Sequence, residues 1–168
     1  NASTVAEIDA HPWPDPDAYD YDHYAEQCES MGDYAVCGGN WSPFFTWGLE
    51  MMGTEQFLMN MRRQPELIHA LLGHMVDFYY ETSRRMFASA KGHLDIFFMG
   101  DDYGTQKGPF MSPRDFRTFI VPHLERLYGL ARAYGLKVMQ HSCGSVRAVL
   151  PDLIAAGMDA LDPVQVRA

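Results

Sequence analysis

The stretch Leu136-Lys137-Val138-Met139-Gln140-His141-Ser142-Cys143-Gly144-Ser145 runs from a short apolar segment into a glycine turn, and two of its side chains are able to bind a metal ion. Residues two apart on an extended segment point the same way, so His141 and Cys143 are expected to face one ion together. Imidazole nitrogen and thiolate sulfur are both ordinary zinc ligands. On these residues alone an alternative stays open, in which His141 ends a strand and Cys143 is a small buried apolar residue.

The apolar segment at 136–140 is one of four predicted strands that alternate with helices. The other strands are predicted at 33–37, 94–99 and 158–161, and the helices at 19–31, 42–52, 53–63, 65–90, 112–134 and 146–156. This alternation predicts an α/β fold with a parallel sheet and right-handed crossovers.

Prolines refine the predicted helices. Ser42 and Ser112 are each followed by proline, which predicts an N-cap and a first-turn proline at the start of two helices. Pro122 is expected to kink or break the helix at 112–134. Pro151 is expected to strain the middle of the helix at 146–156.

The predicted architecture is a (β/α)8 TIM barrel, because no glycine-rich nucleotide-binding motif follows any of the strands. Such a barrel needs at least about 200 residues, and the 168 residues contain four predicted strands. The chain begins without methionine and stops directly after a predicted strand. We therefore expect residues 1–168 to be the central fragment of a single barrel domain, with residues 1–32 as an extended, Pro- and Asp-rich lead-in followed by a helix.

Composition excludes several classes of function. The chain has 13 basic and 22 acidic residues, a net charge of −9, and no cluster of Lys and Arg. This balance disfavours binding to nucleic acid or to an anionic membrane. No apolar run approaches the roughly 18 residues that a membrane span requires. Three widely spaced cysteines are no disulfide framework, so a cytoplasmic location is expected.

Each predicted strand is followed by polar or aromatic side chains that suit a functional site. In a parallel α/β protein the carboxyl ends of the strands meet at one edge, and function collects there. We therefore expect one site to be built from these residues: Asn40 and Trp41, Asp101 and Asp102, His141 and Cys143, Asp162 and Gln165.

Asp101 and Asp102 are the candidate catalytic pair, since a carboxylate is able to anchor a substrate or handle a proton. The alternative for Asp101 is that it orders the turn at 100–104 through its own backbone. Gln106 and Gln165 are candidate substrate-binding groups, with simple loop solvation as the alternative. The remaining histidines are assigned to surface or helix positions: His11, His23, His69, His74, His93 and His123.

Three segments resemble the uroporphyrinogen decarboxylase family, a superfamily that also contains the methylcobalamin:coenzyme M and related corrinoid-dependent methyltransferases. They are HPWPDPDAYDYD at 11–22, GDDYGTQKGPFMSPRDF at 100–116 and VMQHSCGSVRAVLPDLIAAGMDALDPVQ at 138–165. The resemblance implies a (β/α)8 barrel of roughly twice this length. It runs from about His11 to the last residue and is most specific in about the last seventy residues.

The two branches of that family imply different chemistry. The methyltransferases bind Zn²⁺ through a His-x-Cys pair and a later ligand, and the zinc activates a thiol that accepts a methyl group from a corrinoid on a partner protein. His141 and Cys143 match the pair, and the later ligand would fall beyond Ala168. The decarboxylases need no cofactor and hold a tetrapyrrole with an aspartate, for which Asp101 or Asp102 would serve. The His-x-Cys-Gly turn resembles the methyltransferase branch.

In the methyltransferase interpretation, neighbouring polar groups shape the substrate pocket. The candidate substrate-binding residues are Asn40, Trp41, Gln106, Asp162 and Gln165. Asp101, Asp102, Asp162 and Gln165 would also shape the pocket and orient the groups around the metal.

A third possibility is that the 168 residues alone are catalytically incomplete and act, if at all, as an association module. A divided barrel has two unpaired strand edges and a large exposed apolar face. We predict that the isolated 168-residue chain aggregates or oligomerises, as measured by light scattering and sedimentation. A monomer that melts cooperatively would contradict this prediction.

Overall fold

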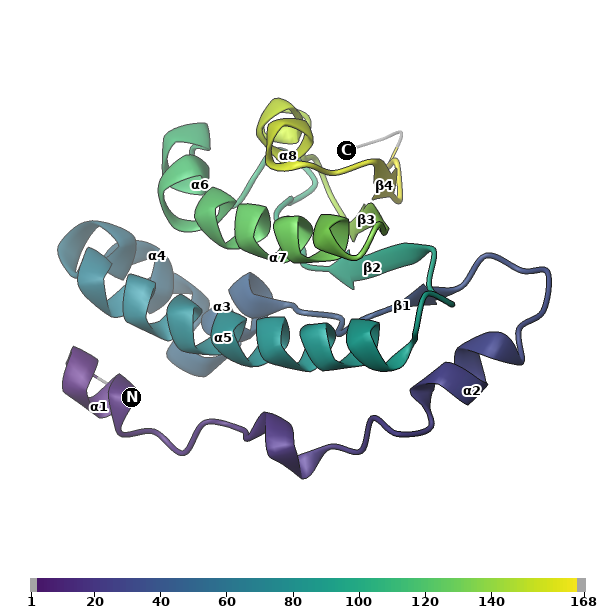
Figure 1. The fold of residues 1–168 in the computed structure, drawn as a ribbon. Coiled ribbons are helices and arrows are strands. Elements are labelled where there is room, and N and C mark those ends of the chain that lie inside the picture. Colours follow the sequence, from purple (N-terminus) through teal and green to yellow (C-terminus); the bar gives the residue numbers. More distant parts are fainter. Residues whose placement is uncertain (1–2, 166–168) are drawn as a thin grey trace.

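The computed structural model describes residues 3–165, and its centre is a four-stranded parallel sheet with helices packed on it (Figure 1). The strands lie in the order in which they occur in the chain, and each pairs in parallel with the next. They are β1 (Cys37–Gly38), β2 (Ile96–Gly100), β3 (Lys137–His141) and β4 (Ala160–Asp162). This arrangement confirms the predicted α/β class and parallel sheet.

Eight α-helices and one short 3-10 helix, η1, which lies between α1 and α2, are present within residues 3–165. Their bounds are α1 (Val5–Asp9), η1 (Pro16–Ala18), α2 (Tyr24–Glu29), α3 (Phe44–Met52), α4 (Thr54–Arg63), α5 (Pro65–Ser89), α6 (Pro113–Phe119), α7 (Val121–Ala133) and α8 (Leu150–Ala156). The long α5 and α7 lie side by side along the sheet, and the N-terminal segment runs beneath α5 (Figure 1). Within residues 3–165, none of the helices is both long and apolar enough to cross a bilayer.

Helix α5 shows why the sequence folds in this way. Its apolar residues recur every three or four positions, which places them on one face of the helix. That face is buried, and it includes Leu67, Ile68, Leu71, Leu72, Met75 and Val76. The prediction of a helix from 65 to about 90 is confirmed.

The register of the sheet decides where the strands end. Gly100 of β2 lies beside His141 of β3, and His141 lies beside Asp162 of β4. All three are the last residues of their strands. The segments that follow β2, β3 and β4 therefore leave the sheet from one edge.

Strand β1 is shorter than predicted and begins later. The prediction placed it at 33–37, but the chain joins the sheet only at Cys37. Before that point, the Asp95 carboxylate accepts a hydrogen bond from the Val36 N–H at 2.8 Å, and the Val36 carbonyl accepts from the Asp95 and Ile96 N–H groups. Tyr34 remains exposed, so the first residues of the predicted strand lie outside the sheet.

Two of the proline predictions are confirmed and two are wrong. Ser112 caps α6 by accepting a hydrogen bond from the Asp115 N–H, and the helix at 112–134 is broken into α6 and α7 around Pro122. Ser42 makes no cap, because it adopts a left-handed conformation with φ of 60°. Pro151 lies in the first turn of α8, where its missing N–H leaves no bond unmade, so it does not strain the helix.

The N-terminal segment is less extended than predicted, since it includes α1 and η1, and the helix predicted at 19–31 is reduced to α2. Trp13 holds this segment on α5. Its indole N–H donates to the Ile8 carbonyl at 2.9 Å, and its ring stacks on His74 at 5.1 Å. His74 in turn lies 2.8 Å from the Asp9 carboxylate.

His123 of α7 gives the fold a sensitivity to acid. Its ring packs against Phe44 at 5.6 Å, and burial lowers its pKa to about 4, helped by the nearby His69 and Arg126. Between pH 6.5 and 4 the unfolded chain binds a proton at this site that the folded protein does not. Acidification therefore lowers the free energy of unfolding.

We predict that, between pH 7 and pH 5, the free energy of unfolding falls by about 2 kcal/mol less in His123→Leu than in wild type. The measurement is chemical denaturation of both proteins at the two pH values. An equal loss in wild type and variant would show that His123 is not the source of this acid sensitivity.

Candidate metal centre

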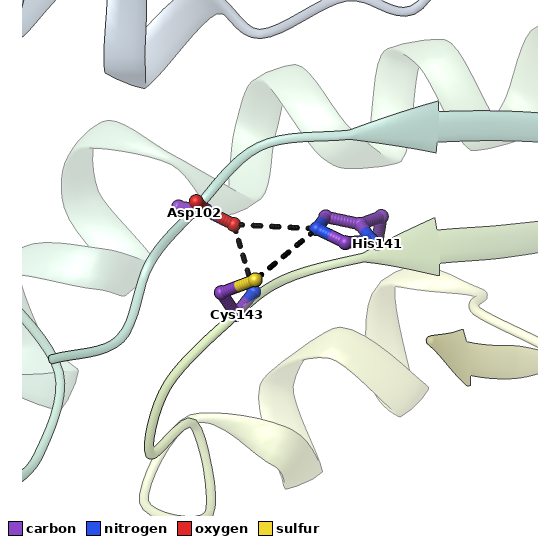
Figure 2. Close-up of side chains that lie close together, drawn as sticks. All are labelled: Asp102, His141 and Cys143. Atoms are coloured by element: carbon purple, nitrogen blue, oxygen red, sulfur yellow. Dashed lines mark hydrogen bonds and ion pairs between the residues drawn. The ribbon is translucent and has the colours of Figure 1, made fainter. Parts of the chain in front are cut away.

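Asp102, His141 and Cys143 meet at the edge of the sheet where β2 and β3 end (Figure 2). Asp102 follows the end of β2 by two residues, His141 is the last residue of β3, and Cys143 follows in the next turn. One ligand atom from each residue lies within 4.8 Å of the others, and all three residues are partly buried. The side chains of the predicted His-x-Cys pair lie close together.

The three ligand atoms are closely spaced. His141 Nε2 lies 3.4 Å from Cys143 Sγ and 3.6 Å from Asp102 Oδ1. Asp102 Oδ1 also accepts a hydrogen bond from the Cys143 N–H at 2.7 Å, which fixes the carboxylate against the turn. Sequence analysis identified Asp102 as a candidate catalytic group. Only the structure shows that its carboxylate lies beside the His141 ring and the Cys143 backbone.

The turn that carries Cys143 is fixed by backbone contacts. Gly144 has φ of 79°, and a Cβ at that position would lie 2.4 Å from the carbonyl carbon of Gly104. The Ser145 N–H donates to the Thr105 carbonyl at 2.8 Å, and the Tyr103 N–H donates to the Ser142 hydroxyl at 3.0 Å. The loops after β2 and β3 are therefore locked together, which sets the position of the Cys143 sulfur.

Asp162 and Gln165, both predicted site residues, lie against the centre from β4 and the segment after it. Asp162 Oδ2 is 3.0 Å from His141 Nδ1, so the carboxylate orients the ring with Nε2 toward Asp102 and Cys143. The Gln165 side-chain carbonyl accepts a hydrogen bond from the Gly144 N–H. Both residues thus contact the His-x-Cys turn.

Asp101 has a different position from its neighbour. Its side chain is 2% exposed, and its carboxylate accepts hydrogen bonds from the Phe45 N–H (2.6 Å), the Thr46 N–H (2.9 Å) and the Thr46 hydroxyl (2.6 Å). Burial raises its pKa to about 7, although these three donors act in the opposite direction. The carboxylate therefore caps α3, and the alternative that it orders its own turn at 100–104 is wrong.

Trp41 forms one wall of the centre. Its ring packs on Gly100, where a Cβ would lie 1.9 Å from the indole, so β2 has room for it only because residue 100 lacks a side chain. The Trp41 ring centre is 5.4 Å from that of His141 and 5.2 Å from that of Phe98. The ring is 44% exposed, so part of it faces solvent beside His141.

Two predicted substrate-binding residues point elsewhere. The Asn40 amide donates to the Thr82 hydroxyl of α5 at 2.9 Å, and its backbone N–H donates to Ser83. Asn40 thus holds the loop before α3 on α5. Gln106 is exposed in the turn at 105–108, and no hydrogen bond within residues 3–165 joins it to the metal centre.

A cavity of about 120 Å³ lies beside the metal centre. Its lining residues come from the segments after β1, β2 and β3: Trp41, Pro43, Thr46, Gly100, Asp101, Asp102 and His141. Sequence analysis missed Thr46 and Pro43. The one sequence feature that could have identified them is their position between the first strand and the first turn of the following helix.

The electrostatics of the centre favour a cation. Burial raises the pKa of the Cys143 thiol, and the Asp102 and Asp162 carboxylates raise it further. A positive charge among these three groups would counter the repulsion between the carboxylates and the thiolate. Imidazole, thiolate and carboxylate are together the donor set of zinc sites.

Parallel βα units with polar side chains at the carboxyl ends of the strands are characteristic of α/β proteins, βα barrels among them. The chain belongs to the uroporphyrinogen decarboxylase family: the family model described as "Uroporphyrinogen decarboxylase (URO-D)" matches residues 4–163. The family fold is a TIM barrel, of which the four parallel strands and the helices that connect them form a part. The predicted fold and family are thereby confirmed.

Comparison with solved structures shows one protein with a similar fold. No curated protein sequence matches the chain. A solved structure, "methyltransferase from Methanosarcina mazei", aligns with a TM-score of 0.64 and 21% identity, over 82% of this chain and 39% of that one. At this identity the likeness shows the fold alone, and the chain spans less than half the length of that protein.

We predict that Asp101→Asn lowers the free energy of unfolding by about 2–3 kcal/mol, because the amide nitrogen of Asn would face a buried donor from α3 that a carboxylate oxygen now accepts. Thr46→Val removes a single hydroxyl bond and is expected to cost about 1 kcal/mol. Denaturant midpoints measure both effects. A cost for Asp101→Asn no larger than that for Thr46→Val would contradict the capping role.

Proposed function

We propose that the full-length protein is a zinc-dependent methyltransferase that moves a methyl group from a corrinoid to a thiol. The observation that carries this proposal is the convergence of Asp102 Oδ1, His141 Nε2 and Cys143 Sγ at one point. Membership of the family and the fold shared with a methyltransferase support it.

The donor atoms fit zinc in type, and the two separations measured from His141 Nε2 fit it in spacing. Zinc bonds of about 2.0–2.3 Å in a tetrahedral arrangement place neighbouring ligand atoms roughly 3.3–3.8 Å apart. The 3.4 Å and 3.6 Å separations from His141 Nε2 fall within that range. Three protein ligands with one open position are characteristic of catalytic zinc sites. Asp102 is thus a candidate third ligand within the chain, where the family resemblance implies a ligand beyond Ala168.

Bound Zn²⁺ would supply the positive charge that keeps a substrate thiol ionised near neutral pH. The residues of the chain would position the metal ligands and the substrate. Asp162 fixes the His141 ring through Nδ1, and the locked turn holds the Cys143 sulfur. The adjacent cavity, with the Trp41 ring as one wall, would hold the body of the thiol substrate.

The methyl donor is proposed to be a corrinoid on a partner protein, as the family resemblance implies. The substrate sulfur would form the new bond to the methyl carbon as the cobalt–carbon bond breaks. The electron pair of that bond would stay on the corrinoid.

A second candidate function is cofactor-free decarboxylation of a tetrapyrrole or a related acid. The description of the matching family model favours it, and Asp102 is the accessible carboxylate that would anchor such a substrate. Asp101 is less suited to this role, because its carboxylate is bound to α3.

We predict that the full-length protein binds about one zinc ion per chain, and that His141→Ala and Cys143→Ser each abolish this binding. Asp102→Asn is expected to weaken it by about 10- to 100-fold or more, because an amide oxygen is a poorer ligand than a carboxylate. Metal analysis and competitive titration with a chelator measure the effects.

Cys37→Ser is the matched control, since Cys37 is an exposed cysteine on β1 outside the metal centre. It should leave zinc binding unchanged. Metal-free protein whose activity survives Cys143→Ser would contradict the zinc proposal and favour the decarboxylase.

A further inference from the structure

We infer that Gln140 and Tyr128 are positioning residues for the His-x-Cys turn. They form a buried chain of hydrogen bonds that begins in α7, crosses to β3 and ends on the carbonyl group of His141. The chain therefore reaches His141 through its backbone and not through its ring. The inference rests on the proposed function in one respect only, namely that the positioned turn binds zinc.

Gln140 is an amide at a position that suits an apolar side chain. It is fully buried in the middle of the sheet, where its register partners are Met99 of β2 and Leu161 of β4. Burying an amide is costly unless its polar atoms are hydrogen-bonded. Its oxygen accepts a hydrogen bond from the Tyr128 hydroxyl at 2.7 Å, and its nitrogen donates to the His141 carbonyl at 2.6 Å. The amide is therefore held at both ends.

The chemistry of the partners fixes the direction of both hydrogen bonds. A backbone carbonyl is only an acceptor, so the amide nitrogen of Gln140 has to face His141. The amide oxygen then faces Tyr128, and the phenol has to be the donor. Burial raises the pKa of Tyr128 above its ordinary value, so the hydroxyl keeps the proton that it donates.

The His141 carbonyl belongs to the peptide group through which the chain leaves β3. It also accepts a hydrogen bond from the Asp101 N–H at 3.1 Å, so both of its lone pairs are used. Rotation of this peptide group would move the His141 ring relative to the Cys143 sulfur. Groups that form a binding site have to be held within about 0.5 Å of their working geometry. The Gln140 amide restrains that rotation.

The support that this chain gives to the turn is internal to the fold. Tyr128 and Gln140 are both fully buried by contacts within residues 3–165. Asp102 and Asp162, which hold the Cys143 N–H and the His141 ring, are partly exposed at the edge of the sheet. The turn is thus held at its surface by two carboxylates and in the interior by a helix-anchored amide.

Tyr103 offers a matched comparison with Tyr128. It is a second fully buried tyrosine, and it directly follows Asp102 in the chain. Its hydroxyl has no hydrogen-bond partner within residues 3–165. Replacing tyrosine by phenylalanine is therefore the same chemical change at both positions, but it breaks a hydrogen bond only at Tyr128.

The first test measures hydrogen exchange over residues 141–145 in the metal-free full-length protein. Four amides of this segment donate hydrogen bonds, so their exchange reports the order of the turn: those of Ser142, Cys143, Gly144 and Ser145. We expect exchange about fivefold faster in Tyr128→Phe and in Gln140→Met than in wild type, because a hydrogen bond that holds the turn is lost. The double variant should exchange no faster than either single variant, since each change breaks the same chain.

Two controls accompany the exchange measurement. Tyr103→Phe should leave exchange of the turn unchanged, and exchange of α4 should be the same in all the variants. Equal exchange of the turn in wild type and Tyr128→Phe would overturn the inference. So would an equal acceleration of the turn and α4, because it would show a general loss of stability instead of a local effect.

The second test measures zinc affinity by competitive titration with a chelator. We expect Tyr128→Phe and Gln140→Met each to weaken zinc binding about tenfold, and Tyr103→Phe to stay within about twofold of wild type. If wild type binds zinc and Tyr128→Phe binds it equally well, the inference is wrong.

The two tests separate the inference from the proposed function. Faster exchange confined to the turn, in a protein that binds no zinc, would support the inference and contradict the zinc-dependent methyltransferase. Zinc binding that is lost in Cys143→Ser but unaffected by Tyr128→Phe would support the proposed function and overturn the inference.

Discussion

The in-register parallel pairing of β2, β3 and β4 is the constraint on which the candidate metal centre depends. Backbone hydrogen bonds hold Gly100, His141 and Asp162 side by side at the ends of their strands. The residues that follow are thereby brought together, although they are distant in the sequence. A shift of β3 by one residue would turn His141 to the opposite face of the sheet and separate it from Asp102 and Asp162.

Contacts beyond the sheet complete the geometry. The Asp101 carboxylate fastens the start of α3 to the end of β2, so the segment after β1 lies over the metal centre. The missing side chain of Gly100 leaves space for the Trp41 ring, and the close approach of Gly104 and Gly144 joins two loops. Buried hydrogen bonds and glycine positions therefore shape the cavity as much as its charged residues do.

In two pairs of adjacent residues, one side chain stabilises the fold and the other faces the candidate metal centre. Asp101 and Asp102 were predicted together as a catalytic pair, yet Asp101 is bound to a helix terminus and Asp102 faces the His-x-Cys turn. Successive residues leaving a strand point in opposite directions, so one faces the protein interior and the other the edge of the sheet. Asn40 and Trp41 divide in the same way, toward α5 and toward His141.

The sequence alone determined the class of fold and the candidate metal ligands. Apolar strand-length segments alternating with amphipathic helices predict a parallel sheet, and His-x-Cys spacing predicts two side chains on one side. The tertiary structure decided which polar groups join them. The burial of Asp101, the position of Asp102 and the orientation of His141 by Asp162 depend on contacts between residues 21 to 56 positions apart. Local propensity carries no information on such contacts, because they are set by strand register and by the packing of loops at the edge of the sheet.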